Sequence, residues 1–89
     1  MTDSLRHAEQ AGNELTESWS QLKLSERSVE QATENLKVTD DNYRSGAVGI
    51  ADLLEAQALF QSSNDNLTDA LCSYQIKKAK YLQSVGNYH

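Results

Sequence analysis

The run Tyr43-Arg44-Ser45-Gly46-Ala47-Val48-Gly49-Ile50 divides this 89-residue chain into two long segments that favour helix. The chain contains no proline, and only Gly12 interrupts the segment that precedes the run. Gly46 can adopt the left-handed conformation that commonly ends a helix, and Gly49 is an acceptable N-cap for the next one. Because a linker of about four residues makes two helices run antiparallel, we predict an all-α fold. It is a long antiparallel α-helical hairpin with helices at about 3–45 and 50–85 and a turn at about 46–49.

Apolar residues recur every seven positions in both segments, which is typical of coiled-coil packing. The first row is Ala8, Leu15, Leu22, Val29, Leu36 and Tyr43, and the second is Leu53, Phe60, Leu67, Tyr74 and Tyr81. The flanking row is expected to contain Leu5, Ala11, Trp19, Ala32, Ala56, Ala70, Leu71 and Val85. Polar residues are expected to interrupt it at Glu26, Thr33, Asp40, Gln57, Asn64 and Lys78. At about 1.5 Å per residue, each helix would be a rod of roughly 60 Å.

The composition excludes several classes of protein. A net charge of −5 argues against a nucleic-acid-binding protein, because affinity for phosphate comes from clustered lysine and arginine. One cysteine makes neither an internal disulfide nor a cysteine-based zinc site. No apolar run approaches the ~20 residues that a membrane-spanning helix needs.

No group of residues supports catalysis. The two histidines, His7 and His89, lie at opposite ends of the chain, where an antiparallel hairpin would bring them together. A weak metal site there is conceivable, but two solvated terminal side chains are the favoured interpretation. We interpret Cys72 as a small buried apolar residue. The sequence therefore predicts a non-enzymatic protein with no metal and no cofactor.

Acidic residues gather around the predicted turn: Asp40, Asp41, Asp52 and Glu55 are opposed only by Arg44. Asp52 and Glu55 are explained as acids near the start of the second helix, where the helix dipole favours them. Asp40 and Asp41 are not, since acids in the last turns of a helix oppose the dipole. The tip is more acidic than folding alone requires.

The residues around the turn resemble a known family. Asn35-Leu36, then Tyr43-Arg44-Ser45-Gly46, then Asp52-Leu53-Leu54-Glu55-Ala56-Gln57 are similar to the repeat of the bacterial outer-membrane efflux proteins, the TolC-like channels. Tyr74, Leu82 and Gly86 fit the end of that repeat, so the resemblance extends from about residue 28 to 86. Its most specific part is the block from Tyr43 to Gln57.

The resemblance implies a transport role in Gram-negative bacteria. Members are homotrimers whose strands form an outer-membrane barrel and whose long helices form a tunnel across the periplasm. A periplasmic adaptor (membrane fusion protein) and an inner-membrane pump dock there, and small molecules or proteins leave through the tunnel. We expect this chain to be one periplasmic hairpin, the C-terminal pair of long helices, of a longer protein whose signal peptide, strands and first repeat lie outside it.

The resemblance also assigns roles at the tip. Asp52 and Glu55 match positions that line the narrowest part of the tunnel with acidic rings, and Tyr43 matches a tyrosine that ties the closed hairpin to its neighbour. Arg44, Ser45, Gly46, Ala47, Val48 and Gly49 would form the adaptor-docking surface. Val48 replaces an arginine latch of some members, for which Arg44 with Asp40 or Asp41 is the substitute.

Two alternatives stay open at this point. One is a generic antiparallel coiled-coil module that mediates assembly, and the other is the hairpin of the adaptor itself. The Tyr43–Gln57 block favours the channel. Because a two-helix hairpin buries only one stripe per helix, we also expect the chain by itself to form a dimer, most simply a twofold four-helix bundle.

Overall fold

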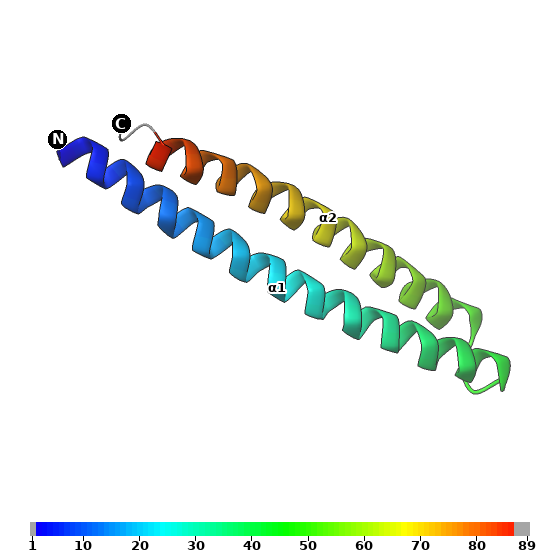
Figure 1. Cartoon of the computed structure of the whole chain (residues 1–89). Helices are drawn as coiled ribbons and strands as arrows, with labels where there is room; N and C mark the ends of the chain where they lie inside the picture. Colours follow the sequence, from blue (N-terminus) through cyan, green and yellow to red (C-terminus); the bar gives the residue numbers. More distant parts are fainter. Residues whose placement is uncertain (1, 87–89) are drawn as a thin grey trace.

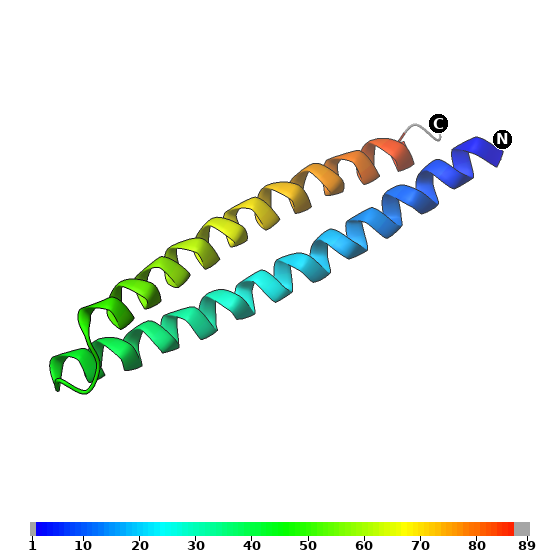
Figure 2. The ribbon, with the colours of Figure 1, turned by 180° about the vertical axis from the view of Figure 1, so that it is seen from behind.

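The computed structural model describes residues 2–86, except for the side chains of residues 2–5, 7 and 8. Two helices make up the fold: α1 spans Thr2–Arg44 and α2 spans Ile50–Gly86. They lie side by side and antiparallel, with both chain ends together and the turn at the other end (Figures 1 and 2). The hairpin measures 67 × 14 × 13 Å. The predicted helical hairpin is confirmed, and each helix boundary falls within about one residue of the expected one.

Two cross-helix contacts show the register of the hairpin. Lys77 Nζ lies 3.3 Å from Glu14 Oε2, and a Cβ atom built on Gly12 would lie 3.5 Å from Tyr81 Cε2. Because the helices are antiparallel, each step forward along α1 is matched by a step backward along α2. Extending the register in this way brings Leu22 level with Ala70, and Ala32 level with Phe60.

Large and small residues alternate along the seam between the helices. The large residues of α1 recur every seven positions, and the residue three positions after each is small: Leu15 and Ser18, Leu22 and Ser25, Val29 and Ala32, Leu36 and Thr39. On α2 the corresponding pairs are Leu53 and Ala56, Phe60 and Ser63, Leu67 and Ala70, Tyr74 and Lys77, Tyr81 and Ser84. In the extended register each large side chain faces a small one or the aliphatic stem of Lys77. Because of this alternation, side chains fill the narrow space between the two helices without voids.

Several residues predicted to lie in the flanking row of the seam are one position too far along the chain. Trp19, predicted to pack in the seam, is 48% exposed, and Leu71 and Val85 are each 43% exposed. Thr33, Gln57 and Lys78 are exposed as well. The seam passes through the residue that precedes each of Trp19, Thr33, Gln57 and Lys78, namely Ser18, Ala32, Ala56 and Lys77. The prediction of Ala32 and Ala56 for this row is confirmed, since both are buried. Two helices packed closely have room for a small residue opposite each Leu, Phe or Tyr, and a second large one would force them apart.

Two further expectations concern the burial of Cys72 and the meeting of His7 with His89. Cys72, predicted to be buried, is exposed, because it lies on the side of α2 away from α1. The suggested meeting of His7 and His89 lies outside the described side chains. Leu5 and Ala8, which were predicted to start the apolar rows, lie outside them too.

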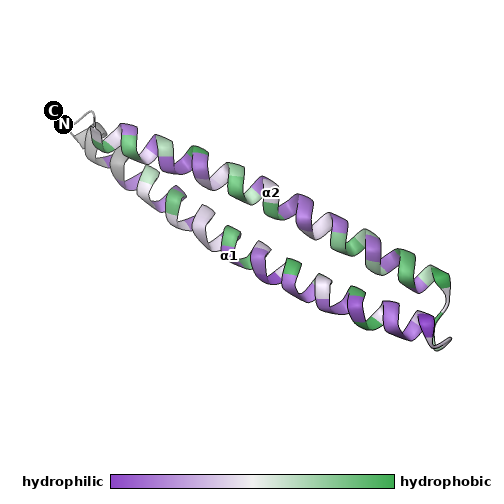
Figure 3. Cartoon of the chain, turned by 45° about the vertical axis from the view of Figure 1, so that its right-hand side comes forward, coloured by the Kyte–Doolittle hydropathy of each residue, from purple (hydrophilic) through white to green (hydrophobic). Residues whose placement is uncertain are grey.

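The core of the hairpin is thin. Of the side chains that the structure describes, only those of Leu22, Ala32, Leu53, Ala56, Ser18 and Ser63 are buried. Apolar and polar residues alternate over the surface of both helices (Figure 3). Neither helix carries an apolar stretch long enough to cross a membrane within residues 2–86. The exposed large apolar residues leave surface for further packing.

Candidate functional site

The tip begins where α1 ends in a Schellman motif. The Gly46 N–H donates to the Tyr43 carbonyl at 3.1 Å, and the Ala47 N–H donates to the Asn42 carbonyl at 2.8 Å. These two bonds close over Gly46, whose φ of +82° lies in the left-handed region. A side chain there would meet no atom within 4 Å, so the glycine is required by backbone conformation and not by space. The sequence predicted this helix end correctly.

The tip resumes helix at Ile50, with Gly49 as the preceding cap. The Asp52 N–H donates to the Gly49 carbonyl at 3.2 Å, which forms the first turn of α2. Val48 is half-buried, and Leu53, five residues later, is buried, as expected for a hydrophobic staple. The chain from Tyr43 to Gly49 is otherwise exposed. The proposed adaptor-docking residues are therefore held in one backbone conformation with their side chains accessible.

The two carboxylates assigned to a constriction lie on one face of α2. Asp52 and Glu55 are three residues apart, so their side chains are neighbours on the helix surface. Both are exposed, and Asp52 lies in the first turn of the helix, where the dipole stabilises an anion. The structure brings these two carboxylates together at the end of the rod, beside the turn.

Arg44 pairs with Asp40 within α1. The Arg44 Nε lies 3.2 Å from Asp40 Oδ2, with the arginine side chain 76% exposed. The alternative partner Asp41 is not used. Among the side chains that the structure describes, the ion pairs are those of Lys23 with Glu26, Arg44 with Asp40, and Lys77 with Glu14. Asp41, Asp52 and Glu55 therefore keep uncompensated charge at the tip. Tyr43, 39% exposed, is accessible beside them.

The net negative charge of the chain comes from the half that contains the tip. Residues 38–76 contain one base, Arg44, against six acids: Asp40, Asp41, Asp52, Glu55, Asp65 and Asp69. Since the whole chain has eight bases and thirteen acids, the remaining residues hold seven of each and are neutral. The sequence alone could have revealed this acidic half of the hairpin, if charges had been counted by their distance from the turn and not separately for each helix.

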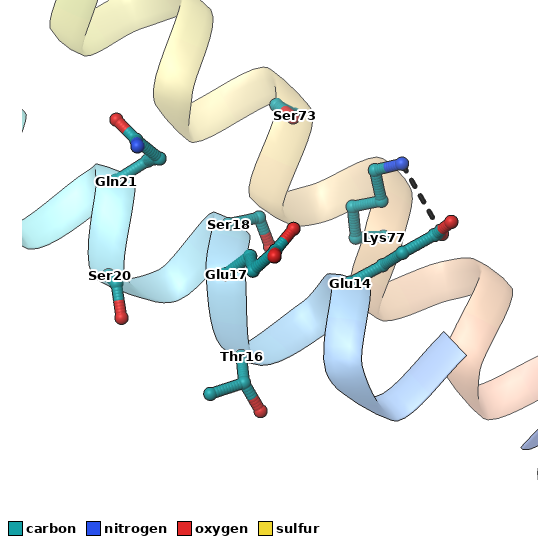
Figure 4. A pocket seen from close by; sticks show the side chains of 8 residues that line it. All are labelled: Glu14, Thr16, Glu17, Ser18, Ser20, Gln21, Ser73 and Lys77. Atoms are coloured by element: carbon teal, nitrogen blue, oxygen red, sulfur yellow. Dashed lines mark hydrogen bonds and ion pairs between the residues drawn. The ribbon is translucent and has the colours of Figure 1, made fainter. Parts of the chain in front are cut away.

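A second polar feature lies nearer the open end. Glu14, Glu17, Ser18 and Gln21 of α1 and Ser73 and Lys77 of α2 line an open groove of about 520 Å³, together with Thr16 and Ser20 (Figure 4). Figure 4 shows the Lys77 ammonium reaching across to Glu14. Both partners of this cross-helix pair are about one-third exposed, and the pair ties the helices together. Sequence reasoning missed it because the two residues are far apart in the chain.

The side chains described by the structure include no cluster of three or more His, Cys, Asp or Glu residues that could hold a metal ion. Asp52 and Glu55 alone supply two carboxylates. Their side chains contribute negative charge to the surface of the tip.

Comparison with known families matches this chain over residues 2–87 to the outer membrane efflux proteins. The chain belongs to the outer membrane efflux protein family. The match covers both helices and the turn between them, and it confirms the resemblance that the Tyr43–Gln57 block indicated. Comparison with curated proteins and with solved structures gives no match.

Membership of this family favours an efflux channel over the two alternatives that the sequence left open, the generic coiled-coil module and the adaptor hairpin. Outer membrane efflux proteins are transport proteins and not enzymes. A long all-α hairpin suits a tunnel segment of such a channel. The adaptor hairpin and the generic coiled-coil module lose their support, because the match extends over nearly the whole chain.

Proposed function

We propose that this hairpin is part of the wall of a trimeric periplasmic tunnel and that its tip narrows the tunnel entrance. The observation that carries the proposal is the position of Asp52 and Glu55. They are exposed carboxylates without an ion pair in the described chain, held at the end of a 67 Å rod next to a rigid turn.

Threefold symmetry would turn these carboxylates into rings. Like charges brought close together repel one another, and a ring of them creates a strongly negative constriction that attracts cations. Protonation or a divalent cation would neutralise that charge. Passage through the entrance is then expected to respond to both.

The turn itself would receive the periplasmic adaptor, through which an inner-membrane pump engages the channel. Support comes from the exposure of Arg44 to Ala47 and of Gly49 and from the Schellman bonds that fix their backbone. A preformed surface loses little conformational entropy on binding. Tyr43 would contact the neighbouring hairpin, while Arg44, held by Asp40, is the candidate latch in place of Val48. The exported molecules would be small molecules or proteins, and the segment would lie in the periplasm below an outer-membrane barrel.

Neutralising the two carboxylates in the full-length channel tests this proposal. With Asp52→Asn and Glu55→Gln together, we expect higher leak conductance in planar bilayers and weaker block by divalent cations, because the acidic rings are gone. The matched control is Asp65→Asn with Asp69→Asn, which removes the same charge three to four turns further along α2 and should leave both quantities unchanged. Unaltered conductance and block in the tip variant would contradict the proposal.

A further inference from the structure

The two helices carry opposite charges near the open end of the hairpin. Because Lys77 pairs across the seam with Glu14, residues 75–83 of α2 lie level with residues 9–17 of α1. The α2 stretch carries three bases and no acid: Lys77, Lys78 and Lys80. The α1 stretch carries three acids and no base: Glu9, Glu14 and Glu17. We call these two stretches together the charged end.

Toward the tip the charges of the two helices have the same sign. Residues 49–74 of α2 carry four acids and no base, and residues 18–43 of α1, which lie level with them, carry five acids and three bases. The ion pairs described in this part of the hairpin lie within α1 and join no residue of α2. Charges across the seam therefore attract the helices at the charged end and repel them toward the tip.

Burial is distributed in the opposite way. Every buried side chain that the structure describes belongs to residues 18–43 or 49–74. At the charged end the seam residues Leu15, Lys77 and Tyr81 are only half-buried. The free energy of burial grows with the apolar area removed from water. Packing therefore holds the helices together toward the tip, whereas the charged end depends more on the attraction between its opposite charges.

The dipoles of the separate helices do not explain this arrangement. A helix dipole favours acids in the first turn and bases in the last turn, and its effect falls off within those turns. Glu14 lies about three turns into α1, and Lys77 lies about two and a half turns before the end of α2. Their charges are explained by the contact between the helices.

We propose that the helices separate at the charged end when the ionic strength is high, while they stay paired toward the tip. Such local opening occurs where few apolar contacts hold a structure together. Salt weakens both the attraction at the charged end and the repulsion toward the tip, because the Debye length falls from ~30 Å at ~0.01 M to ~3 Å at ~1 M. The two parts of the rod therefore respond to salt in opposite directions. This inference does not depend on the gating role proposed for the tip.

Distances between spin labels on the 89-residue chain test the proposal. In a Cys72→Ser background, Gln10→Cys with Gln83→Cys carries labels at the charged end, and Gln31→Cys with Gln61→Cys carries them toward the tip. These glutamines are exposed and uncharged, and each pair is nearly level in the register. Between ~0.02 M and ~1 M KCl we expect the first distance to lengthen and the second to stay constant or shorten. Diluting labelled chain into unlabelled chain removes distances between different chains.

Exchanging the charges of the cross-helix pair distinguishes attraction from packing. Lys77→Glu places a like charge beside Glu14 and should lengthen the charged-end distance already at low salt. Glu14→Lys together with Lys77→Glu restores opposite charges and should recover most of the short distance. The matched control is Lys37→Glu, which makes the same change of charge at an exposed position toward the tip and should leave the charged-end distance unchanged.

The same measurements can overturn the proposal. A charged-end distance that does not change with salt, or two distances that lengthen together, would mean that the hairpin responds as one unit. If the exchanged pair left the charged end as open as Lys77→Glu alone, damaged packing would explain the single variant and the proposal would be wrong. In each variant the Gln31–Gln61 distance shows whether the helices toward the tip remain paired, as the proposal requires.

Discussion

The tip and the open end of the hairpin are held in different ways. At the tip the chain is fixed by backbone hydrogen bonds around Gly46, and the surface carries unbalanced negative charge. Toward the open end the helices are joined by side chains, through the pair of Lys77 with Glu14 and the packing of Tyr81 on Gly12, and acids and bases balance. The difference suggests that the tip combines a rigid shape with a strong field, whereas the rest of the rod serves mainly to position it.

The largest loss of stability is expected from a substitution in the seam between the helices, which both regions share. Leu53→Ala removes a side chain that is 8% exposed in the first turns of α2, which should destabilise the hairpin by about 2–3 kcal/mol through lost burial and a cavity. Its neighbour Leu54 is 56% exposed, so Leu54→Ala should change stability by less than about 0.5 kcal/mol. Urea unfolding at a fixed protein concentration measures both. Similar losses for the two variants would mean that the seam does not pass through Leu53.

The next largest loss of stability is expected from a substitution that strains the backbone of the tip. Gly46→Ala forces a side chain into a left-handed conformation and should cost about 1–2 kcal/mol. Gly49→Ala, at a position without a positive φ and with no atom within 4 Å of the added Cβ, should cost less, about 0.5 kcal/mol, because alanine is a poorer N-cap than glycine. Thermal unfolding followed by circular dichroism distinguishes them. If the two alanine variants melted together, the rigid-tip description would be wrong.

The smallest effect concerns the open end. Lys77→Met removes the cross-helix ion pair while keeping most of the aliphatic stem, and both partners are about one-third exposed. We expect a loss of less than about 1 kcal/mol, and the difference from the unsubstituted chain should disappear in high salt because exposed pairs are screened. Arg44→Met breaks the more exposed pair at the tip and should cost still less. Unfolding in low and high salt tests this order, and a larger loss for Arg44→Met would reverse the comparison.

Much of the fold was predictable because local signals agree. The absence of proline, the heptad rows and the Gly46 and Gly49 positions give the two helices and the turn. The block from Tyr43 to Gln57 indicates the family. Sequence patterns placed Trp19 and Cys72 wrongly, because hydrophobicity identifies residues that favour burial without saying which of two adjacent rows the partner helix covers. That choice depends on how closely the helices approach, and the close approach selects Ser18 over Trp19.

The sequence by itself determined two helices, their length, the position of the bend and an acidic composition around it, since helix propensity, glycine conformation and charge are properties of local residues. Only the tertiary structure decided which rows meet, which partner Arg44 takes, and that Glu14 pairs with Lys77. Each of these depends on the register and rotation of one helix against the other, which is set by the fit of large side chains against small ones along the whole seam.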